Sequence, residues 1–272
     1  MSHLVGIATE TLAIIEAGGY TGPEGWVDLR GAIDGCLAGT RLVPDDLELG
    51  SVAQPGDRHT RIEVTDETTG RAARRLAAEH DRVLALNYAS ARNPGGGFIR
   101  GARAQEEDLA RCSALYPSLL TQPRYYADNR AHPSPAYRDH AIYSPDVPFF
   151  RGDDLALLPR PYLLSIVTAP APNAGELARA GAFDAAGIAA ILARRATRVL
   201  AIAAREGHGV LVLGAWGCGV FRNDPATVAS VFSDLLGGPF CGRFERVVFA
   251  VYDKASGQPN LAAFTRRFGG ER

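Results

Sequence analysis

Apolar residues recur along this chain in short runs, and segments with apolar positions at helical spacing separate them, as is typical of an α/β protein. Strands are predicted at residues 61–64, 83–86, 162–168, 210–213 and 246–252. Helices are predicted at residues 67–80, 183–206, 226–236 and 261–268. Because a strand, helix, strand order suits parallel pairing, we expect the strands to form one α/β sheet flanked by helices.

The first sixty residues carry shorter elements, namely a helix at 5–17, a strand at 26–29 and a helix at 30–37. Since none of them bears recognisable chemistry, we interpret residues 1–60 as an accessory, mainly helical extension. Residues 61–272 would then form the core of a single domain that spans 1–272. The segment 125–139 is rich in Pro, Tyr and charge, and it is predicted to be a surface excursion.

Three consecutive glycines, Gly95, Gly96 and Gly97, follow the strand predicted at 83–86 and precede a predicted helix. Glycines leave the backbone N–H groups of a loop free to approach a ligand closely, and a row of such groups suits an anion such as a diphosphate. A mobile surface turn is the alternative reading of Gly-Gly-Gly alone.

Two carboxylates follow this loop closely, in the sequence Gln105-Glu106-Glu107. Acidic residues at a helix start are common because they complement the helix dipole, so a solvated first turn is one explanation. Carboxylates beside a phosphate-binding loop repel the ligand, however, and general acid or base chemistry is a reason to place them there.

A second strand, glycine loop and helix unit begins at residue 210, and its loop carries Gly214, Gly217 and Gly219. Taken alone, these glycines are equally compatible with an ordinary tight connection. Two such loops at strand ends favour a ligand site, because ligands in open α/β sheets bind beyond the carboxyl ends of the strands. We therefore expect the loops to hold opposite sides of one diphosphate.

The run Asn-Pro-Gly-Gly-Gly-Phe at 93–98, followed by Gly-Ala-Arg-Ala-Gln-Glu-Glu at 101–107, resembles the signature of bacterial-type poly(ADP-ribose) glycohydrolases. The resemblance extends through residues 214–225 and, more loosely, over most of the chain. It implies a macrodomain-like fold, a mixed central sheet flanked by helices, with an N-terminal extension.

The resemblance also implies roles for particular residues. Glu107 would be the principal catalytic residue, Glu106 would bind and orient ribose hydroxyls, and Phe221 would position the terminal ribose. Asn87 and Asn93 are candidates for ribose hydrogen bonds, although turn formation is the commoner role of such residues. Tyr252 is a candidate for adenine stacking, with rim packing as the alternative. The remaining predicted substrate-binding residues are Gly95, Gly96, Gly97, Phe98, Gln105, Gly217, Cys218, Gly219, Val220 and Asn223.

Adjacent helical residues point about 100° apart, so Glu106 and Glu107 are poorly placed to flank one glycosidic bond from opposite faces. Because the resemblance assigns the principal role to Glu107, we expect this residue to act first as general acid on the 2′-oxygen leaving group and then as general base on water. The neighbouring diphosphate would stabilise the developing positive charge on the sugar.

Composition narrows the list of partners. The net charge of −1 gives no indication of bulk attraction to nucleic acid or to an acidic membrane. Cys36, Cys112, Cys218 and Cys241 are widely spaced, which argues against a zinc site and favours free thiols. We expect a cytoplasmic monomer without metal or cofactor that binds poly(ADP-ribose) and ADP-ribose, with ADP-ribosylated proteins as the polymer carriers.

Two other functions use the same loops. One is a non-catalytic macrodomain that reads ADP-ribose, and the other is a hydrolase of a different ADP-ribose derivative. The two carboxylates favour an enzyme over a reader. The family resemblance implies cleavage from the polymer terminus, whereas the residue pattern itself does not separate terminal from internal cleavage.

Overall fold

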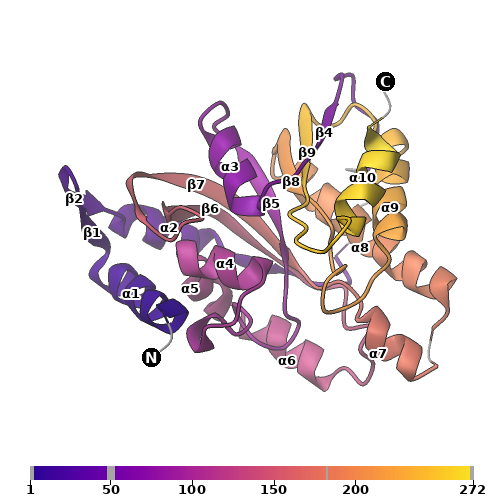
Figure 1. The fold of residues 1–272 in the computed structure, drawn as a ribbon, viewed down its shortest axis with the longest axis horizontal. Helices are drawn as coiled ribbons and strands as arrows, with labels where there is room; N and C mark the ends of the chain where they lie inside the picture. The colour runs from indigo at the N-terminus through magenta and orange to yellow at the C-terminus, as the bar shows by residue number, and fades with distance from the viewer. Residues whose placement is uncertain (1–2, 48–52, 182, 270–272) are drawn as a thin grey trace.

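A seven-stranded mixed sheet forms the centre of the computed structural model, which describes residues 3–47, 53–181 and 183–269. The strand order is β3-β6-β7-β5-β8-β9-β4, and all pairs from β7 to β4 are parallel, whereas β6 is antiparallel to both of its neighbours (Figure 1). The strands in chain order are β3 (Arg41–Val43), β4 (Arg61–Thr65), β5 (Val83–Tyr88), β6 (Ala141–Arg151), β7 (Leu157–Ala169), β8 (Val210–Leu213) and β9 (Arg246–Ala250). The predicted mixed sheet flanked by helices is confirmed.

Helices cover both faces of this sheet. They are α1 (His3–Ala17), α2 (Arg30–Gly39), α3 (Thr69–Ala77), the short η2 (Phe98–Arg100), α4 (Gln105–Cys112), α5 (Leu115–Leu120), α6 (Pro123–Ala131), α7 (Ala174–Arg179), α8 (Ala185–Arg205), α9 (Pro225–Gly237) and α10 (Pro259–Phe268). A separate two-stranded hairpin, β1 (Gly19–Gly22) and β2 (Gly25–Asp28), follows α1. None of the described helices is long and apolar enough to cross a membrane.

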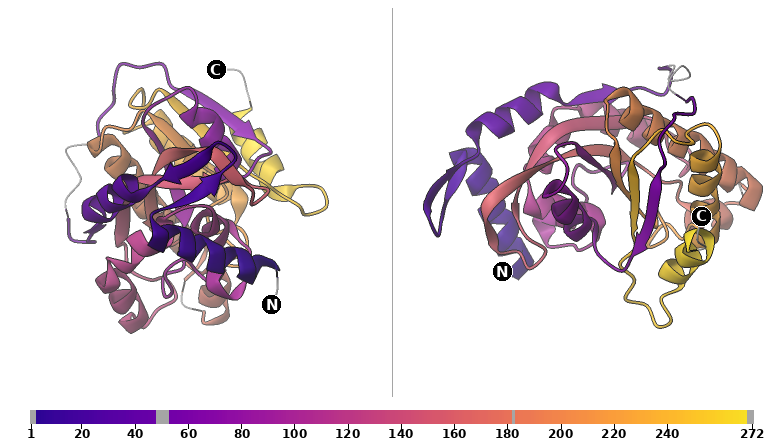
Figure 2. Two further views of the ribbon diagram at one scale, coloured as in Figure 1. Left: turned by 90° about the vertical axis from the view of Figure 1, so that its left-hand side faces the viewer. Right: turned by 90° about the horizontal axis from the view of Figure 1, so that it is seen from above.

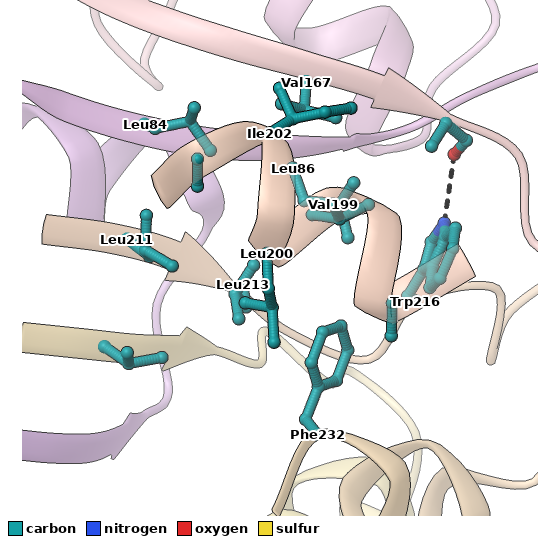
Figure 3. Close-up of a cluster of buried hydrophobic side chains, with 14 of the residues drawn as sticks. Leu84, Leu86, Val167, Val199, Leu200, Ile202, Leu211, Leu213, Trp216 and Phe232 are labelled. Carbon is teal, nitrogen blue, oxygen red and sulfur yellow. Dashed lines mark hydrogen bonds between the residues drawn. The ribbon is translucent and has the colours of Figure 1, made fainter. Parts of the chain in front are cut away.

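Alternate residues of the central strands supply two cores. Leu84 and Leu86 of β5 belong to the core beneath α8 and α9, whereas Val83 and Ala85 belong to the core beneath α3 and α4. Figure 3 shows the first of these cores, where the leucines of β5 and β8 meet α8 and Phe232 of α9. A strand that is buried on both faces is apolar throughout, which is why these runs are visible in the sequence.

Two segments differ from the sequence prediction. The prediction of a surface excursion at 125–139 is wrong in its first part, because α6 forms there and buries Tyr125 and Tyr126. Strand β6 escapes prediction because it contains Pro145 and Pro148, which normally interrupt strands. The pairing of β6 with β7 shifts register between Ser144 and Val147, which accommodates Pro145, whereas Pro148 stays in register opposite Leu163.

The N-terminal residues are built into the rest of the molecule. Strand β3 pairs with β6 and so forms an edge of the central sheet. Helix α1 packs against η2 and α4, and the Thr11 hydroxyl donates to the Arg111 carbonyl at 2.7 Å. Figure 2 shows that α1 and α10 lie on opposite sides of the molecule. The boundary at residue 60 stays a prediction.

Candidate active site

The carboxyl ends of β5, β7, β8 and β9 lie at one edge of the sheet, because these four strands are parallel. Loops at this edge border a cavity of about 840 Å³. The first glycine loop contributes flanking residues such as Asn93 and Arg103, and the second contributes Gly217 and Gly219. A cavity of this size suits a small-molecule or cofactor-sized ligand. Arg92, Arg103 and Lys254 are among its lining residues and supply positive charge that suits an anionic ligand.

The first glycine loop is shaped around a glutamate. Gly95 and Gly96 have φ values of +64° and +60°, a region that favours glycine. A Cβ atom at Gly96 would lie 2.2 Å from Oε1 of Glu107, so a larger residue would collide with this carboxylate. The Gly97 amide donates to the same oxygen at 2.9 Å. The glycines therefore allow the loop to close directly onto Glu107.

Gln105 fastens the start of α4 to the end of β5. Its side-chain oxygen accepts from the Tyr88 amide at 2.8 Å, and its side-chain nitrogen donates to the Leu86 carbonyl at 2.8 Å. These two bonds continue the strand's hydrogen-bonding pattern through a side chain. The next residues, Glu106 and Glu107, are consequently held beside the loop that follows β5.

Glu106 is almost fully enclosed, with only 3% of its surface exposed. One carboxylate oxygen accepts from Nδ2 of Asn87 at 3.3 Å, and the other accepts from the Ser90 amide at 2.6 Å. Burial raises the pKa of Glu106 to about 8, and the charge of Glu107 adds to the rise, although the hydrogen bonds from Ser90 and Asn87 oppose it. Near neutral pH the free protein therefore keeps a proton on this carboxyl.

Glu107 is less enclosed and lines the same cavity. Its Oε1 accepts from Gly97, whereas its Oε2 accepts no hydrogen bond from the residues that the structure describes. Both oxygens of Glu106 are occupied by protein donors, so the two neighbours differ in what they offer a ligand. Glu107 has an oxygen available for chemistry, and Glu106 has the contacts of a positioning group.

The second glycine loop is anchored from below by Trp216. Its indole Nε1 donates to the Ala169 carbonyl at 3.1 Å, which ties the end of β8 to the end of β7 (Figure 3). Gly217 has a φ of +73°, and a Cβ atom there would lie 2.5 Å from Cβ of Ala171. Asn223 closes the loop by donating to the carbonyls of Pro172 and Gly217 at 2.9 and 3.1 Å.

Three successive amides of this loop, those of Gly219, Val220 and Phe221, donate to no described residue. Gly219 has open space around it, and Val220 is 87% exposed. The N-terminus of α9 is already satisfied, because the Asp224 carboxylate accepts from the Thr227 amide at 2.8 Å. The loop amides, rather than the helix terminus, are therefore the groups available to an anion.

The cavity brings together only part of the predicted site. The predicted residues that line it are Asn93, Gln105, Glu106, Glu107, Gly217, Gly219, Val220, Phe221 and Tyr252. The predicted residues outside the lining are Asn87, Gly95, Gly96, Gly97, Phe98, Cys218 and Asn223. Asn87 and Phe98 are fully buried, and Asn87 also donates to Thr168 at 3.1 Å. For these buried residues the contacts are those of loop support, and their roles toward a ligand stay predictions.

Tyr137 also lines the cavity, and sequence reasoning missed it because it lies in the segment predicted to be a surface excursion. Its ring centroid lies 5.9 Å from that of Phe221. The available signal was an aromatic residue in a Pro-rich segment, and this pattern is too common to be selective.

Metal ligands do not gather among residues 3–47, 53–181 and 183–269, where no group of three or more His, Cys, Asp or Glu side chains could hold an ion. The four cysteines are free thiols, as predicted. Burial raises the pKa of Cys218 to about 12, so this thiol in the second loop is a poor nucleophile.

The sheet and the paired glycine loops define a macrodomain-like protein with carboxylates at its ligand site. The model of the family described as "Microbial-type PARG, catalytic domain" matches residues 8–152, which include the first loop and both glutamates. Solved structures extend the similarity over nearly the whole chain, so that the second loop is included. The chain belongs to the microbial-type poly(ADP-ribose) glycohydrolase family.

Three solved structures illustrate the similarity. Poly(ADP-ribose) glycohydrolase from Thermomonospora curvata is 49% identical, with a TM-score of 0.93 over 97% of this chain and 99% of that chain. Its complex with the inhibitor ADP-HPD is 50% identical, with a TM-score of 0.92 and the same coverage. The Deinococcus radiodurans enzyme in complex with ADP-ribose is 48% identical, with a TM-score of 0.84 over 89% and 98% of the two chains. A comparison with curated proteins finds no match.

Proposed function

We propose that this protein hydrolyses the ribose–ribose O-glycosidic bond of poly(ADP-ribose) and releases ADP-ribose. The observation that carries the proposal is one cavity lined by both glycine loops and by two unequal carboxylates from a single helix start. The structural relatives support the choice of substrate, because they are poly(ADP-ribose) glycohydrolases and include complexes with ADP-ribose and ADP-HPD.

In this mechanism Glu107 acts first as general acid. Its carboxyl proton passes to the 2′-oxygen of the leaving ribose while the bond from that oxygen to the anomeric carbon breaks. The diphosphate of the substrate, held at the amides of Gly219, Val220 and Phe221, stabilises the positive charge that develops on the sugar. Glu107, now ionised, takes a proton from water as the water oxygen bonds to the anomeric carbon.

Glu106 positions the substrate in this mechanism. Its carboxyl is fixed by Asn87 and Ser90 and faces the same cavity, so it can orient ribose hydroxyl groups.

The test is release of ADP-ribose from purified poly(ADP-ribose), with the wild type compared with Glu107→Gln. We expect the variant to bind ADP-ribose like the wild type while its turnover falls by about 10²–10⁴-fold, the usual contribution of a general acid or base. Glu24→Gln changes an exposed glutamate outside the cavity lining and is the matched control. If Glu107→Gln turned over like the wild type, the assignment of Glu107 as general acid and base would be wrong.

The same assay separates the alternatives. Binding of ADP-ribose without release by the wild type would indicate a reader, and release only from an O-acyl or side-chain linkage would indicate a different hydrolase. We further propose cleavage from the polymer terminus, as expected from the bacterial branch. Monomeric ADP-ribose should then be the only small product at early times, whereas early oligomers would indicate internal cleavage.

A further inference from the structure

One residue of the connection between α6 and β6, residues 132–140, lines the cavity, and this residue is Tyr137. Tyr137 in this connection lines the cavity and packs its ring against Phe221 of the second glycine loop, with an interplanar angle of 38°. The preceding helix reaches the first loop, because Nη1 of Arg130 donates to the Arg92 carbonyl at 2.7 Å. The segment from α6 to Tyr137 therefore touches both loops.

The backbone of Tyr137 is in the left-handed region, with a φ of +61°. This conformation is unfavourable for a bulky non-glycine residue, and such strain persists only where the surroundings enforce it. Here the Tyr137 amide donates to the Ser134 carbonyl at 3.1 Å, and its carbonyl accepts from Nη2 of Arg195 at 2.9 Å. These two hydrogen bonds hold the backbone of Tyr137 in this conformation.

Arg195 of α8 is the centre of this arrangement and is only 2% exposed. Its Nε donates to Oδ1 of Asp139 at 2.6 Å, and its Nη1 donates to the Pro170 carbonyl at 2.9 Å. Nη2 also donates to the Ala136 carbonyl. One buried guanidinium therefore joins the Tyr137 segment to the loop after β7, which itself contacts the second glycine loop through Ala171.

We propose that Tyr137 is a substrate-positioning residue whose ring, together with Phe221, forms an aromatic wall that seats the ADP-ribose unit between the two glycine loops. The proposal relies on the proposed function for the identity of the ligand. Simple packing would account for a buried aromatic ring, since many aromatic residues are buried. It does not account for a strained backbone that is held by a buried arginine at the cavity wall.

The experiment replaces Tyr137 without disturbing its backbone. Asn tolerates the left-handed region, so Tyr137→Asn removes the ring and keeps the conformation. We expect the dissociation constant of ADP-ribose, measured by calorimetry, to rise about tenfold, the size of effect of a lost aromatic contact. KM for the polymer should rise with it, more than kcat falls. Tyr137→Phe should recover most of the lost affinity, because it restores the ring.

Asp146→Asn is the matched control, because Asp146 is another residue with positive φ, at +45°, and it lies outside the cavity lining. Its affinity for ADP-ribose should equal that of the wild type. If Tyr137→Asn does not fold, Tyr137→Gly removes the ring and also accepts this φ. Thermal unfolding of each variant identifies loss of stability.

A Tyr137→Asn protein with unchanged affinity and KM but a lower melting temperature would show that Tyr137 only packs, and it would overturn the proposal. Failure of the proposed function gives a different result. In that case the wild type binds ADP-ribose but releases none from the polymer, and the comparison of dissociation constants still decides the role of Tyr137.

Discussion

Two neighbouring glutamates on one helix turn occupy different environments. Burial and two protein donors surround Glu106, whereas Glu107 keeps one oxygen free and meets a loop that only glycine can form. Their chemical difference therefore comes from what surrounds each side chain, since the residue type is the same. A close carboxylate pair with unlike environments is a recurring way to separate two roles.

The raised pKa of Glu106 predicts a pH-dependent stability. A carboxyl with a pKa of about 8 when folded and about 4.3 when unfolded stabilises the folded state most at low pH. That contribution is lost as the pH rises from about 4.3 toward 8. Glu106→Gln cannot ionise, so the free energy of unfolding of the variant, relative to the wild type, should increase between pH 5 and pH 8.

The expected relative gain is on the order of 2–4 kcal/mol, since each pH unit across the shifted range contributes about 1.4 kcal/mol. Urea unfolding of both proteins at pH 5 and pH 8 measures it. The exposed Glu24→Gln should keep the pH dependence of the wild type. Parallel curves for the wild type and Glu106→Gln would mean that Glu106 does not carry this linkage.

At the scale of elements, helix α8 carries two adjacent arginines that differ in burial and therefore in their expected contribution to stability. Arg194 and Arg195 are adjacent and both bind Asp139, but their side chains are 55% and 2% exposed. Burial alone would raise the pKa of Asp139, yet these two arginines hold it below its usual value. Arg194 and Arg195 therefore share a partner and adjacent positions in the sequence, and they differ mainly in burial.

We expect Arg195→Ala to lower the free energy of unfolding by about 3–5 kcal/mol, because three carbonyl groups and a carboxylate lose a buried donor. Arg194→Ala removes a largely exposed ion pair and should cost about 0–1 kcal/mol. Denaturant unfolding of both variants measures the difference. Equal losses would contradict the view that the buried guanidinium organises this region.

The helices and strands that the sequence predicted are those with a clear apolar period. Strands β5, β7, β8 and β9 are buried on both faces, and α8 has long helical spacing, so each is visible as a local pattern. Strand β6 contains two prolines, and its pairing with β7 is visible only in three dimensions. Tyr137 was missed for a similar reason, because its contacts with Arg195 join residues far apart in the chain.

At the scale of the whole molecule, helix α1 contacts elements of the domain core. Glu10 forms an ion pair with the buried Arg151 at 2.7 Å, and Ala8 packs with Phe98 of η2. The sequence could not reveal these contacts, since each joins residues that lie far apart along the chain. Through them the N-terminal helix contacts the end of β6 and the short helix η2, which precedes α4.

Because residues from several separate elements line the cavity, ligand binding should stabilise the fold. ADP-ribose at about 100 times its dissociation constant is expected to add about 2.7 kcal/mol to the free energy of unfolding. Thermal unfolding with increasing ADP-ribose measures this effect. Inorganic diphosphate at the same concentration contacts the loops alone and should give a smaller shift. An unchanged melting temperature with ADP-ribose would argue against this cavity as its site.

The position of β5 between β7 and β8 has a consequence for synthesis on the ribosome. Both neighbours of this strand are translated after it, so Glu106 and Glu107 emerge while β5 still has two open edges. Open strand edges invite pairing with other chains. The loop at 214–224 is translated later, after α8, and α9, β9 and α10 follow it. A nascent chain that ends before residue 214 thus carries both glutamates without the second glycine loop.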